Sequence, residues 1–336
     1  MSRALSRRGW LRLAVGGAAA TSLAGSSADE AADTAALQWR QRALLGFGTT
    51  LSLRVAHGDA AIAEAGLDAV VAAIRHVERQ MSLFDPDSAL SVLNREGELR
   101  DPHPDLVQVL TLSRQVSAAS AGRFDVTVQP LWKAWADAQR LGRAPTSREL
   151  QAARRCVGWQ GVALRPDRIR LTRPGMALTL NGIAQGFAAD VASARLQALG
   201  IRHALVNTGE WATLGESPQA GPWRLGVAHP RVAGQLLATL IGDGRAIACS
   251  SDVLSFSADH RHHHIFDPRS GDSPRALSTV VVAAPTCALA DALTKVMFMG
   301  TVSDALALAA RWKVDVLAAD KAGAWSASPG LRVAAV

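Results

Sequence analysis

The stretch MSLFDPDSALSVLN, residues 81–94, sets the order of the first helices of the chain. Its centre, Phe84 to Ser88, carries a proline and two aspartates, a composition typical of a turn. Ser88 stands directly before Ala89–Asn94, so its hydroxyl is expected to cap a short helix there. Upstream, Ala60–Gln80 has apolar residues at helical spacing and no proline, which predicts a long helix.

Strand and helix signals alternate along the rest of the chain, which predicts an α+β unit with helices packed on a largely antiparallel sheet. Leu44–Val55 is expected to be one strand, and residues 140–155 a polar, irregular connection. Further helices are expected at Pro104–Ala119, Leu131–Leu141, Gly182–Leu199, Ala288–Met299 and Ser303–Trp312. Further strands are expected at Val162–Leu164, Ile169–Leu171, Ala177–Leu180, His203–Asn207, Arg224–Val227, Leu236–Ile241, Ala246–Cys249, His263–Phe266, Ser278–Ala284 and Val314–Ala318.

The net charge of +7 is concentrated at the N-terminus. Residues 1–28 carry four arginines and no acid, and the remainder holds 32 basic against 29 acidic residues. Without a long basic run or interleaved aromatic residues, nucleic acid is not expected as a partner. The 336 residues are 49% hydrophobic, which is ample for a large core.

The N-terminus has the pattern of an export signal. SRRGWL, residues 6–11, is a twin-arginine pattern, followed by a weakly apolar run to Ala24 and small residues near Ala28. This predicts a signal peptide over residues 1–28 and a periplasmic protein; a basic tail is the alternative. The apolar run is too short to span a bilayer, and no other segment has membrane length, so no stable membrane span is expected.

Two segments have the residue types of a binding site. Asn181–Gly186 lies where a strand passes into a helix, and its glycines would expose backbone N–H groups to an anion; a simple tight turn is the alternative. In Gly122–Pro130, Phe124 could stack on a flat ring and Asp125 could accept a hydrogen bond from it. A core phenylalanine and a capping aspartate explain the same pattern.

Four histidines, His260 and His262 to His264, suggest a transition metal, but no carboxylate stands at matching spacing. We expect His264 in a site and the other three as exposed polar residues. Asp291 and Lys295 lie one helical turn apart and are either a surface ion pair or two groups facing a cleft. The absence of G-x-G-x-x-G, G-K-[ST], G-x-S-x-G and C-x-x-C leaves Rossmann, P-loop, serine hydrolase and zinc or thioredoxin chemistry without support.

In order and spacing, these segments resemble the ApbE family of periplasmic FAD:protein FMN transferases from about Leu45 to Gly300. The strongest match is residues 81–94, which resemble M-S-x-[YF]-x-P-x-S-E-[LI]-S-x-[LF]-N. The other matches are Gly46–Thr49 to M-G-T, Gly122–Leu131 to G-x-F-D-x-T-V-x-P-L, Leu180–Asp190 to D-L-[GS]-G-I-A-K-G-Y-A-x-D from its second position, Val206–Glu210 to V-N-x-G-G-[DE] with one glycine missing, His264–Gly271 to H-I-[IV]-D-P-x-T-G, and Asp291–Lys295 to D-A-L-[SA]-T.

The resemblance implies a two-lobed, T-fold-like α+β domain over residues 37–330, with FAD in a cleft between the lobes and Mg²⁺ bridging its pyrophosphate. It implies transfer of FMN to a Thr or Ser hydroxyl of an exported or membrane redox protein, with release of AMP. The implied cofactor-binding residues are Phe47, Phe84, Arg123, Phe124, Asp125, Thr179, Gln185, Phe266 and Asp267. The implied metal ligands are the Gly182 carbonyl, Asp291 and, after a local shift, Thr294, and the implied catalytic residues are Asp291, Lys295 and His264.

Three residues depart from the family pattern. Thr179 replaces an acid, Gln185 replaces Lys or Glu, and Lys295 replaces the usual metal-binding Thr. An ammonium cannot ligate Mg²⁺, but it can hold a fixed positive charge beside Asp291 in the ion's place. Two other functions therefore stay open: a non-catalytic FAD-binding accessory protein of an electron-transfer complex, and an enzyme that hydrolyses FAD to FMN and AMP.

Overall fold

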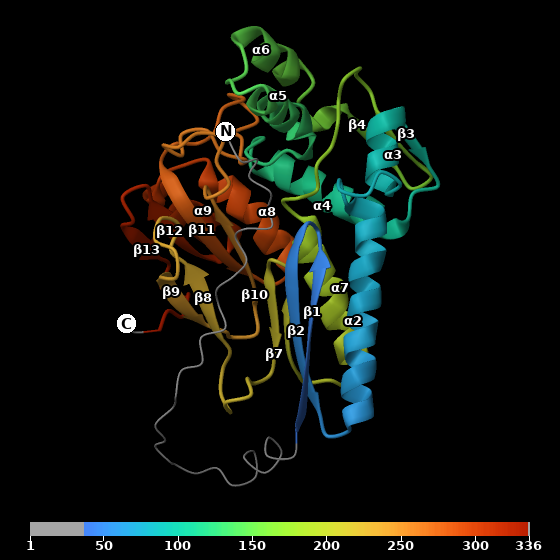
Figure 1. The fold of residues 1–336 in the computed structure, drawn as a ribbon, viewed down its shortest axis with the longest axis vertical. Helices are drawn as coiled ribbons and strands as arrows, with labels where there is room; N and C mark the ends of the chain where they lie inside the picture. Colours follow the sequence, from blue (N-terminus) through green and yellow to red (C-terminus); the bar gives the residue numbers. More distant parts are fainter. Residues whose placement is uncertain (1–36, 335–336) are drawn as a thin grey trace.

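Residues 37–334 are described by a computed structural model, in which an eight-stranded antiparallel sheet forms the centre (Figure 1). The strands lie in the order β1-β2-β6-β7-β10-β11-β12-β13. They are β1 (Gln38–Gly46), β2 (Thr49–His57), β6 (His203–Asn207), β7 (Trp211–Leu214), β10 (Ala246–Ser251), β11 (Leu277–Ala284), β12 (Asp315–Asp320) and β13 (Trp325–Ala327). The predicted signal peptide, residues 1–28, lies outside the described residues.

The first two strands form a hairpin, so the single strand predicted over Leu44–Val55 is wrong. Gly46 at the end of β1 pairs with Thr49 at the start of β2 across the turn Phe47-Gly48. Both turn residues have positive φ, 49° at Phe47 and 75° at Gly48, as a two-residue hairpin turn of this twist requires. This backbone is strained for phenylalanine, and the sequence lacks the Asn-Gly or Asp-Gly signal that marks such a turn.

Four helices cover one face of the sheet: α2 (Ala60–Met81), α7 (Ala184–Ala198), α8 (Cys287–Phe298) and α9 (Val302–Trp312). α2 runs along most of the length of the molecule and packs on α7, which packs on α8 (Figure 1). β11 lies against α8 and is buried at every position. Its run of β-branched and small apolar residues suits a strand that is covered on both faces.

A second hairpin, β8 (Arg224–Ala228) and β9 (Leu236–Ile241), covers the opposite face of the sheet. Its residues Trp223, Leu225 and Leu240 form a separate apolar core with Ile247 and Val281 of the sheet. Because successive side chains of a strand point to opposite faces, the central strands contribute to both cores.

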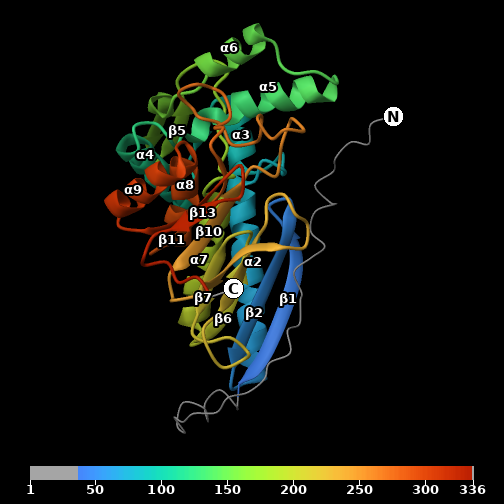
Figure 2. The same cartoon turned by 90° about the vertical axis from the view of Figure 1, so that its left-hand side faces the viewer.

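The upper part of the molecule is mostly helical (Figure 2). It contains α3 (Ala89–Glu96), α4 (Pro104–Ala119), α5 (Gln129–Arg140), α6 (Ser147–Arg155), the 3₁₀ turns η2 (Val126–Val128) and η3 (Trp159–Gly161), and a small sheet of β3 (Glu98–Arg100), β5 (Arg168–Leu171) and β4 (Val162–Arg165). α9 packs against β12 of the large sheet. The prediction of an irregular stretch over residues 140–155 is wrong in its second half, because Thr146 and Glu149 form a reciprocal capping box that starts α6.

Two further predicted strands do not form. Ala177–Leu180 is extended, but the N–H of Leu178 donates to Asn94 Oδ1 at 2.6 Å and its carbonyl accepts from Asn94 Nδ2 at 2.8 Å. An asparagine side chain thus replaces a partner strand. Residues 263–266 lie in the long loop between β10 and β11, where an isolated bridge joins Ser255 to His263.

The prediction that His260, His262 and His263 are exposed is wrong. His263 is fully buried, packs on Phe298 and donates from Nε2 to the Pro274 carbonyl at 2.9 Å. Burial lowers the pKa of His263 to about 4. His260 and His262 are half-buried, and the ring of His262 stacks on Trp135.

The predicted helices are all confirmed, with ends shifted by a residue or two, and so are most of the strands after residue 160. Strands β1, β3, β7 and β13 were not predicted as separate strands. Within residues 37–334, no helix is both long and apolar enough to cross a membrane.

Candidate functional site

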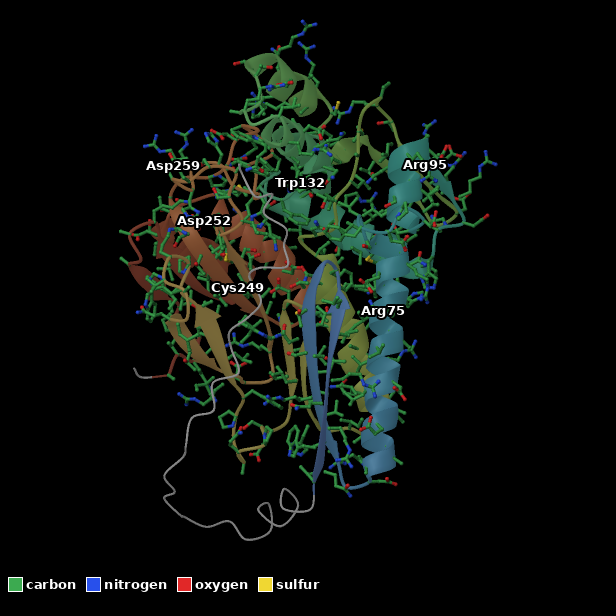
Figure 3. The ribbon with its side chains drawn as sticks, in the orientation of Figure 1. Arg75, Arg95, Trp132, Cys249, Asp252 and Asp259 are labelled. Atoms are coloured by element: carbon green, nitrogen blue, oxygen red, sulfur yellow. The ribbon has the colours of Figure 1, made fainter. Side chains whose placement is uncertain are left out.

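A cavity of about 430 Å³ opens where the β1–β2 turn, the start of α7, the end of β10 and the loop after β10 meet. Figure 3 marks two residues that line it, Trp132 on α5 above and Cys249 on β10 below. Many residues singled out in the sequence line this cavity: Phe47, Arg123, Phe124, Asp125, Thr179, Gly182, Gln185, His264, Phe266 and Lys295. The motifs of the sequence therefore meet in one place, although they come from distant parts of the chain.

Four expected site residues, Phe84, Asp267, Asp291 and Thr294, do not line the cavity but lie beside residues that do. Phe84 is 53% exposed, and a Cβ built on Gly48 would lie 3.0 Å from its ring, so the ring packs on the hairpin turn. Asp267 pairs with Arg269 at 2.7 Å and follows Phe266 in the chain. Asp291 and Thr294 are buried behind Lys295.

The hairpin turn forms an aromatic wall of the cavity. Phe47 is 9% exposed, and its backbone N–H donates to Glu78 Oε1 on α2 at 2.7 Å. The other carboxylate oxygen of Glu78 accepts from Arg75 at 2.6 Å. These contacts hold the strained turn in place and present the phenylalanine ring to the cavity.

Asp125 is a capping residue as well as a wall residue. Its Oδ1 accepts from the backbone N–H of Thr127 at 2.8 Å and from the Thr127 hydroxyl at 2.6 Å, and its Oδ2 accepts from the Trp159 N–H at 2.9 Å. Burial raises the pKa of this carboxyl group, although these hydrogen bonds oppose the shift. Asp125 thus ties η2 to the segment before β4 and positions the neighbouring Phe124, which is 5% exposed.

Arg123 carries an unsatisfied donor. Its Nη1 atom is buried, yet it has no hydrogen-bond partner among the described residues. The side chain lines the cavity. A buried guanidinium N–H without an acceptor is costly, so its natural partner is an anionic group bound in the cavity.

The start of α7 presents backbone to the cavity. The N-cap residue Ile183 makes no side-chain cap, but the Asp291 carboxylate accepts from the first-turn N–H of Gly186 at 3.3 Å. Gln185 Nε2 donates to the Thr208 carbonyl at 2.7 Å, and the Thr208 hydroxyl donates to the Gln185 carbonyl at 2.8 Å. This pair locks Gln185 onto the turn after β6 and fixes the first turn of α7. Thr179, before the turn, accepts from the Asn181 N–H at 3.3 Å.

Three ionisable residues form a charged corner at the floor of the cavity. The ammonium of Lys295 contacts Asp291 Oδ1, while Asp291 Oδ2 accepts from the Gly186 N–H at 3.3 Å. Glu210, which is 5% exposed, accepts from the Cys249 N–H at 2.7 Å. Burial and the neighbouring Asp291 raise the pKa of Glu210 well above its usual range. Burial opposes the charged form of Lys295, but Asp291 and Glu210 outweigh it and raise the Lys295 pKa.

The expected metal ligands do not form an open donor set. Thr294 is fully buried, its hydroxyl donates to the Asp291 carbonyl at 2.6 Å, and it lies 2.7 Å from Ser250 Oγ. Asp291 already holds Lys295 and Gly186. A Cβ built on Gly182 would lie 3.1 Å from Lys295 Cε, so the lysine stem occupies the space beside the Gly182 backbone. These residues do not fit a magnesium ion, which needs several free oxygen ligands in octahedral geometry.

The wall opposite α7 is the loop after β10, and it carries His264. The Nδ1 atom of His264 lies 3.1 Å from the Leu254 carbonyl and therefore carries the ring proton, so Nε2 is the basic nitrogen of the neutral ring. Phe266 packs among Leu131, Trp135 and Phe256 and closes the upper end of this wall.

A buried ion cluster anchors this loop. Asp252 is fully buried and accepts two hydrogen bonds from Arg231, at 2.6 and 2.7 Å, and one from Lys321. The next two residues, Val253 and Leu254, line the cavity. Asp252 therefore fixes the position from which the Leu254 carbonyl orients His264.

Sequence patterns did not identify every residue of the site. Ser250 and Cys249 lie on β10 and Trp132 lies on α5, and none of the three carries a local signal of function. Glu210 was present in the Val206–Glu210 match but received no role. Elsewhere in the described chain, His76, His103 and Asp105 bring three potential metal ligands within 4.8 Å of one another. They already bond to each other: His76 Nε2 pairs with Asp105 Oδ2 at 3.0 Å, and His103 Nδ1 accepts from the Asp105 N–H at 3.2 Å.

Comparison with known proteins agrees with this arrangement. Residues 47–318 match the model of the ApbE family. The FAD:protein FMN transferase of Vibrio cholerae is 31% identical over 239 residues, which cover 68% of this chain and 71% of that protein.

Two solved structures share the fold. The apo form of the flavinyl transferase ApbE from Pseudomonas stutzeri has 28% identity and a TM-score of 0.73 and covers 87% of this chain and 94% of its own. The ApbE protein from Thermotoga maritima has a TM-score of 0.78 at 22% identity, covers 87% of this chain and 97% of its own, and supports the fold alone.

Proposed function

This chain belongs to the ApbE family, and on that basis we propose that it is an FAD:protein FMN transferase. The observation that carries the proposal is the composition of the cavity. Aromatic rings of Phe47 and Phe124 line the same space as the cations Arg123 and Lys295 and the first turn of α7. A flavin needs flat apolar walls and a pyrophosphate needs fixed positive charge, and both are present.

In the proposed reaction, FAD is the donor substrate. The hydroxyl oxygen of an acceptor Thr or Ser forms a bond to the phosphorus of the FMN half, the bond from that phosphorus to the bridging oxygen breaks, and AMP leaves with that oxygen. The hydroxyl proton needs a base, and we assign this role to His264, which lines the cavity. Positioning and charge neutralisation supply most of the catalysis of such a phosphoryl transfer.

The acceptor belongs to the class of exported or membrane redox proteins, in keeping with the twin-arginine pattern at residues 6–11. We propose that residues 1–28 direct export to the periplasm and that residues 37–330 act there as one flavin transferase domain. Replacement of both Arg7 and Arg8 by lysine should keep the protein in the cytoplasm, as cell fractionation would show. Normal export of this variant would contradict the proposal.

The test of the activity uses purified protein, FAD and a peptide with a single acceptor threonine. Mass spectrometry should detect a peptide that carries one FMN, and AMP should appear in equal amount. A matched peptide with valine in place of threonine should remain unmodified. Release of FMN and AMP without a peptide adduct would favour FAD hydrolysis, and stable FAD binding without any turnover would favour an accessory FAD-binding protein.

A further inference from the structure

Lys295 occupies a place where a soluble cation would otherwise be expected. It extends from α8 to the floor of the cavity with 19% of its side chain exposed, while its partner Asp291 is 1% exposed. The lysine stem passes Gly182 at the turn before α7. The ammonium therefore lies beside the turn that leads into α7, at the floor of the cavity.

The ammonium is positioned to bind a second partner. It has three N–H donors, and Asp291 is the one acceptor that it contacts among the described residues. Its remaining N–H donors belong to a side chain, Lys295, that lines the cavity. The carboxylate of Asp291, which the ammonium contacts, keeps the lysine charged despite its burial, because it raises the pKa of Lys295.

The same contacts exclude a metal ion at this corner. A divalent cation bound to Asp291 would lie next to the ammonium, and like charges at such a separation repel strongly where water is scarce. Thr294 cannot compensate, because its hydroxyl already bonds the Asp291 carbonyl and Ser250 behind the cavity wall.

We infer that Lys295 is the permanent cation that binds the pyrophosphate of the nucleotide in this protein, and that nucleotide binding requires no divalent metal. The inference rests on the proposed use of FAD as substrate. Its partner cation is Arg123, which lines the same cavity and whose buried Nη1 has no hydrogen-bond acceptor among residues 37–334. Two fixed monovalent cations thus replace one divalent ion.

The test measures FAD affinity by flavin fluorescence or calorimetry, so that it does not depend on turnover. For the wild-type protein, the Kd in EDTA and the Kd in Mg²⁺ should agree within about twofold. Lys295→Met should weaken FAD binding by about tenfold or more in both buffers, because a charge-assisted contact to phosphate is lost. Lys133→Met is the matched control: Lys133 also pairs with an aspartate one turn away, Asp137, but it is exposed on α5, and its loss should leave the Kd unchanged.

Two further variants separate binding from folding and from metal use. Asp291→Asn combined with Lys295→Met removes both buried charges and should still bind FAD weakly, even where Lys295→Met alone unfolds. Lys295→Thr should gain a requirement for Mg²⁺, seen as an FAD affinity that rises by about tenfold or more when the ion is added.

A wild-type protein that loses FAD affinity in EDTA and regains it in Mg²⁺ would overturn the inference without any variant. So would an unchanged Kd for Lys295→Met. Metal-independent FAD binding without transfer to a peptide would leave the inference standing and refute the proposed transferase, whereas FAD binding that requires Mg²⁺, together with transfer to the peptide, would do the opposite. Failure to bind FAD in either buffer would refute both.

Discussion

The carboxylate of Glu78 on α2 accepts the backbone N–H of Phe47 at 2.7 Å, and this single bond joins the long helix to the strained turn that lines the cavity. The bond spans 31 residues of sequence. Glu78 does not line the cavity, but it holds the backbone of Phe47, which does.

Glu78→Ala should therefore weaken FAD binding without removing any residue of the cavity. Loss of about 1 kcal/mol of hydrogen bonding corresponds to a Kd about fivefold higher. Arg75→Ala is the control, since it removes the other partner of Glu78 and leaves the bond to Phe47 intact (Figure 3). Equal losses of affinity in the two variants, measured by FAD titration, would argue against control through the turn.

Arg123→Met should lower FAD affinity by about tenfold while the free energy of unfolding stays the same or rises. The reason is that the buried Nη1 has no hydrogen-bond partner among the described residues, so its removal relieves a desolvation cost that offsets the lost attraction to Asp267 and Asp304. Arg95→Met, on the surface of α3 beside Glu96, should change neither quantity (Figure 3). A large drop in the unfolding free energy of Arg123→Met, with unchanged Kd, would assign this arginine a structural role instead.

Acid should destabilise the protein through His263. Its pKa is about 4 in the folded protein and 6.5 in the reference state. Between these pH values, His263 therefore binds a proton in the unfolded chain but not in the folded chain. Stability is therefore complete above about pH 6.5 and falls as the pH drops toward 4, by about 3 kcal/mol in total.

Denaturant titrations between these pH values would measure this fall. His263→Gln should be less stable at neutral pH but should show a flatter pH dependence, whereas His57→Gln, near the start of α2, should retain the wild-type slope. A wild-type slope in His263→Gln would show that other groups cause the acid effect.

Asp252→Ala should lower stability by about 2 kcal/mol, less than a fully enclosed pair would lose, because Arg231 and Lys321 both reach solvent. It should also raise the KM for FAD, since the loop that holds Leu254 and His264 loses its anchor. Asp259→Ala is the matched control on the same loop, where Asp259 makes only exposed contacts (Figure 3). Equal changes in the melting temperature and in the KM for FAD in Asp252→Ala and Asp259→Ala would contradict the anchoring role.

Periodicity was sufficient to predict the helices, because each carries a continuous apolar face and clear end signals. The end signal was overlooked once, at Thr146 and Glu149, where a capping box starts α6 within a polar stretch. The turn at Phe47-Gly48 could not be predicted locally, because its conformation depends on Glu78. Ala177–Leu180 has the apolar pattern of a strand, and only the tertiary contact with Asn94 shows that a side chain pairs with it.

The site was partly predictable for a similar reason. Glycines, aromatic residues and charges within motifs could be assigned to a cavity wall before their positions were known. Residues such as Ser250 and Cys249 come from a short apolar strand, where nothing distinguishes a cavity residue from a core residue. Conversely, the sequence alone did not distinguish the members of the histidine cluster by burial. In the structure, His263 is a buried core residue, whereas His264 lines the cavity.

The cavity is assembled from distant parts of the chain, with Phe47 from the first hairpin and Lys295 from the helix that follows β11. During synthesis, the aromatic wall would leave the ribosome long before the lysine. A nascent chain therefore has no complete pocket until nearly all of it has emerged, and a bound nucleotide would mark a molecule that has finished folding. Any quality control that reads nucleotide occupancy would distinguish complete molecules from truncated ones.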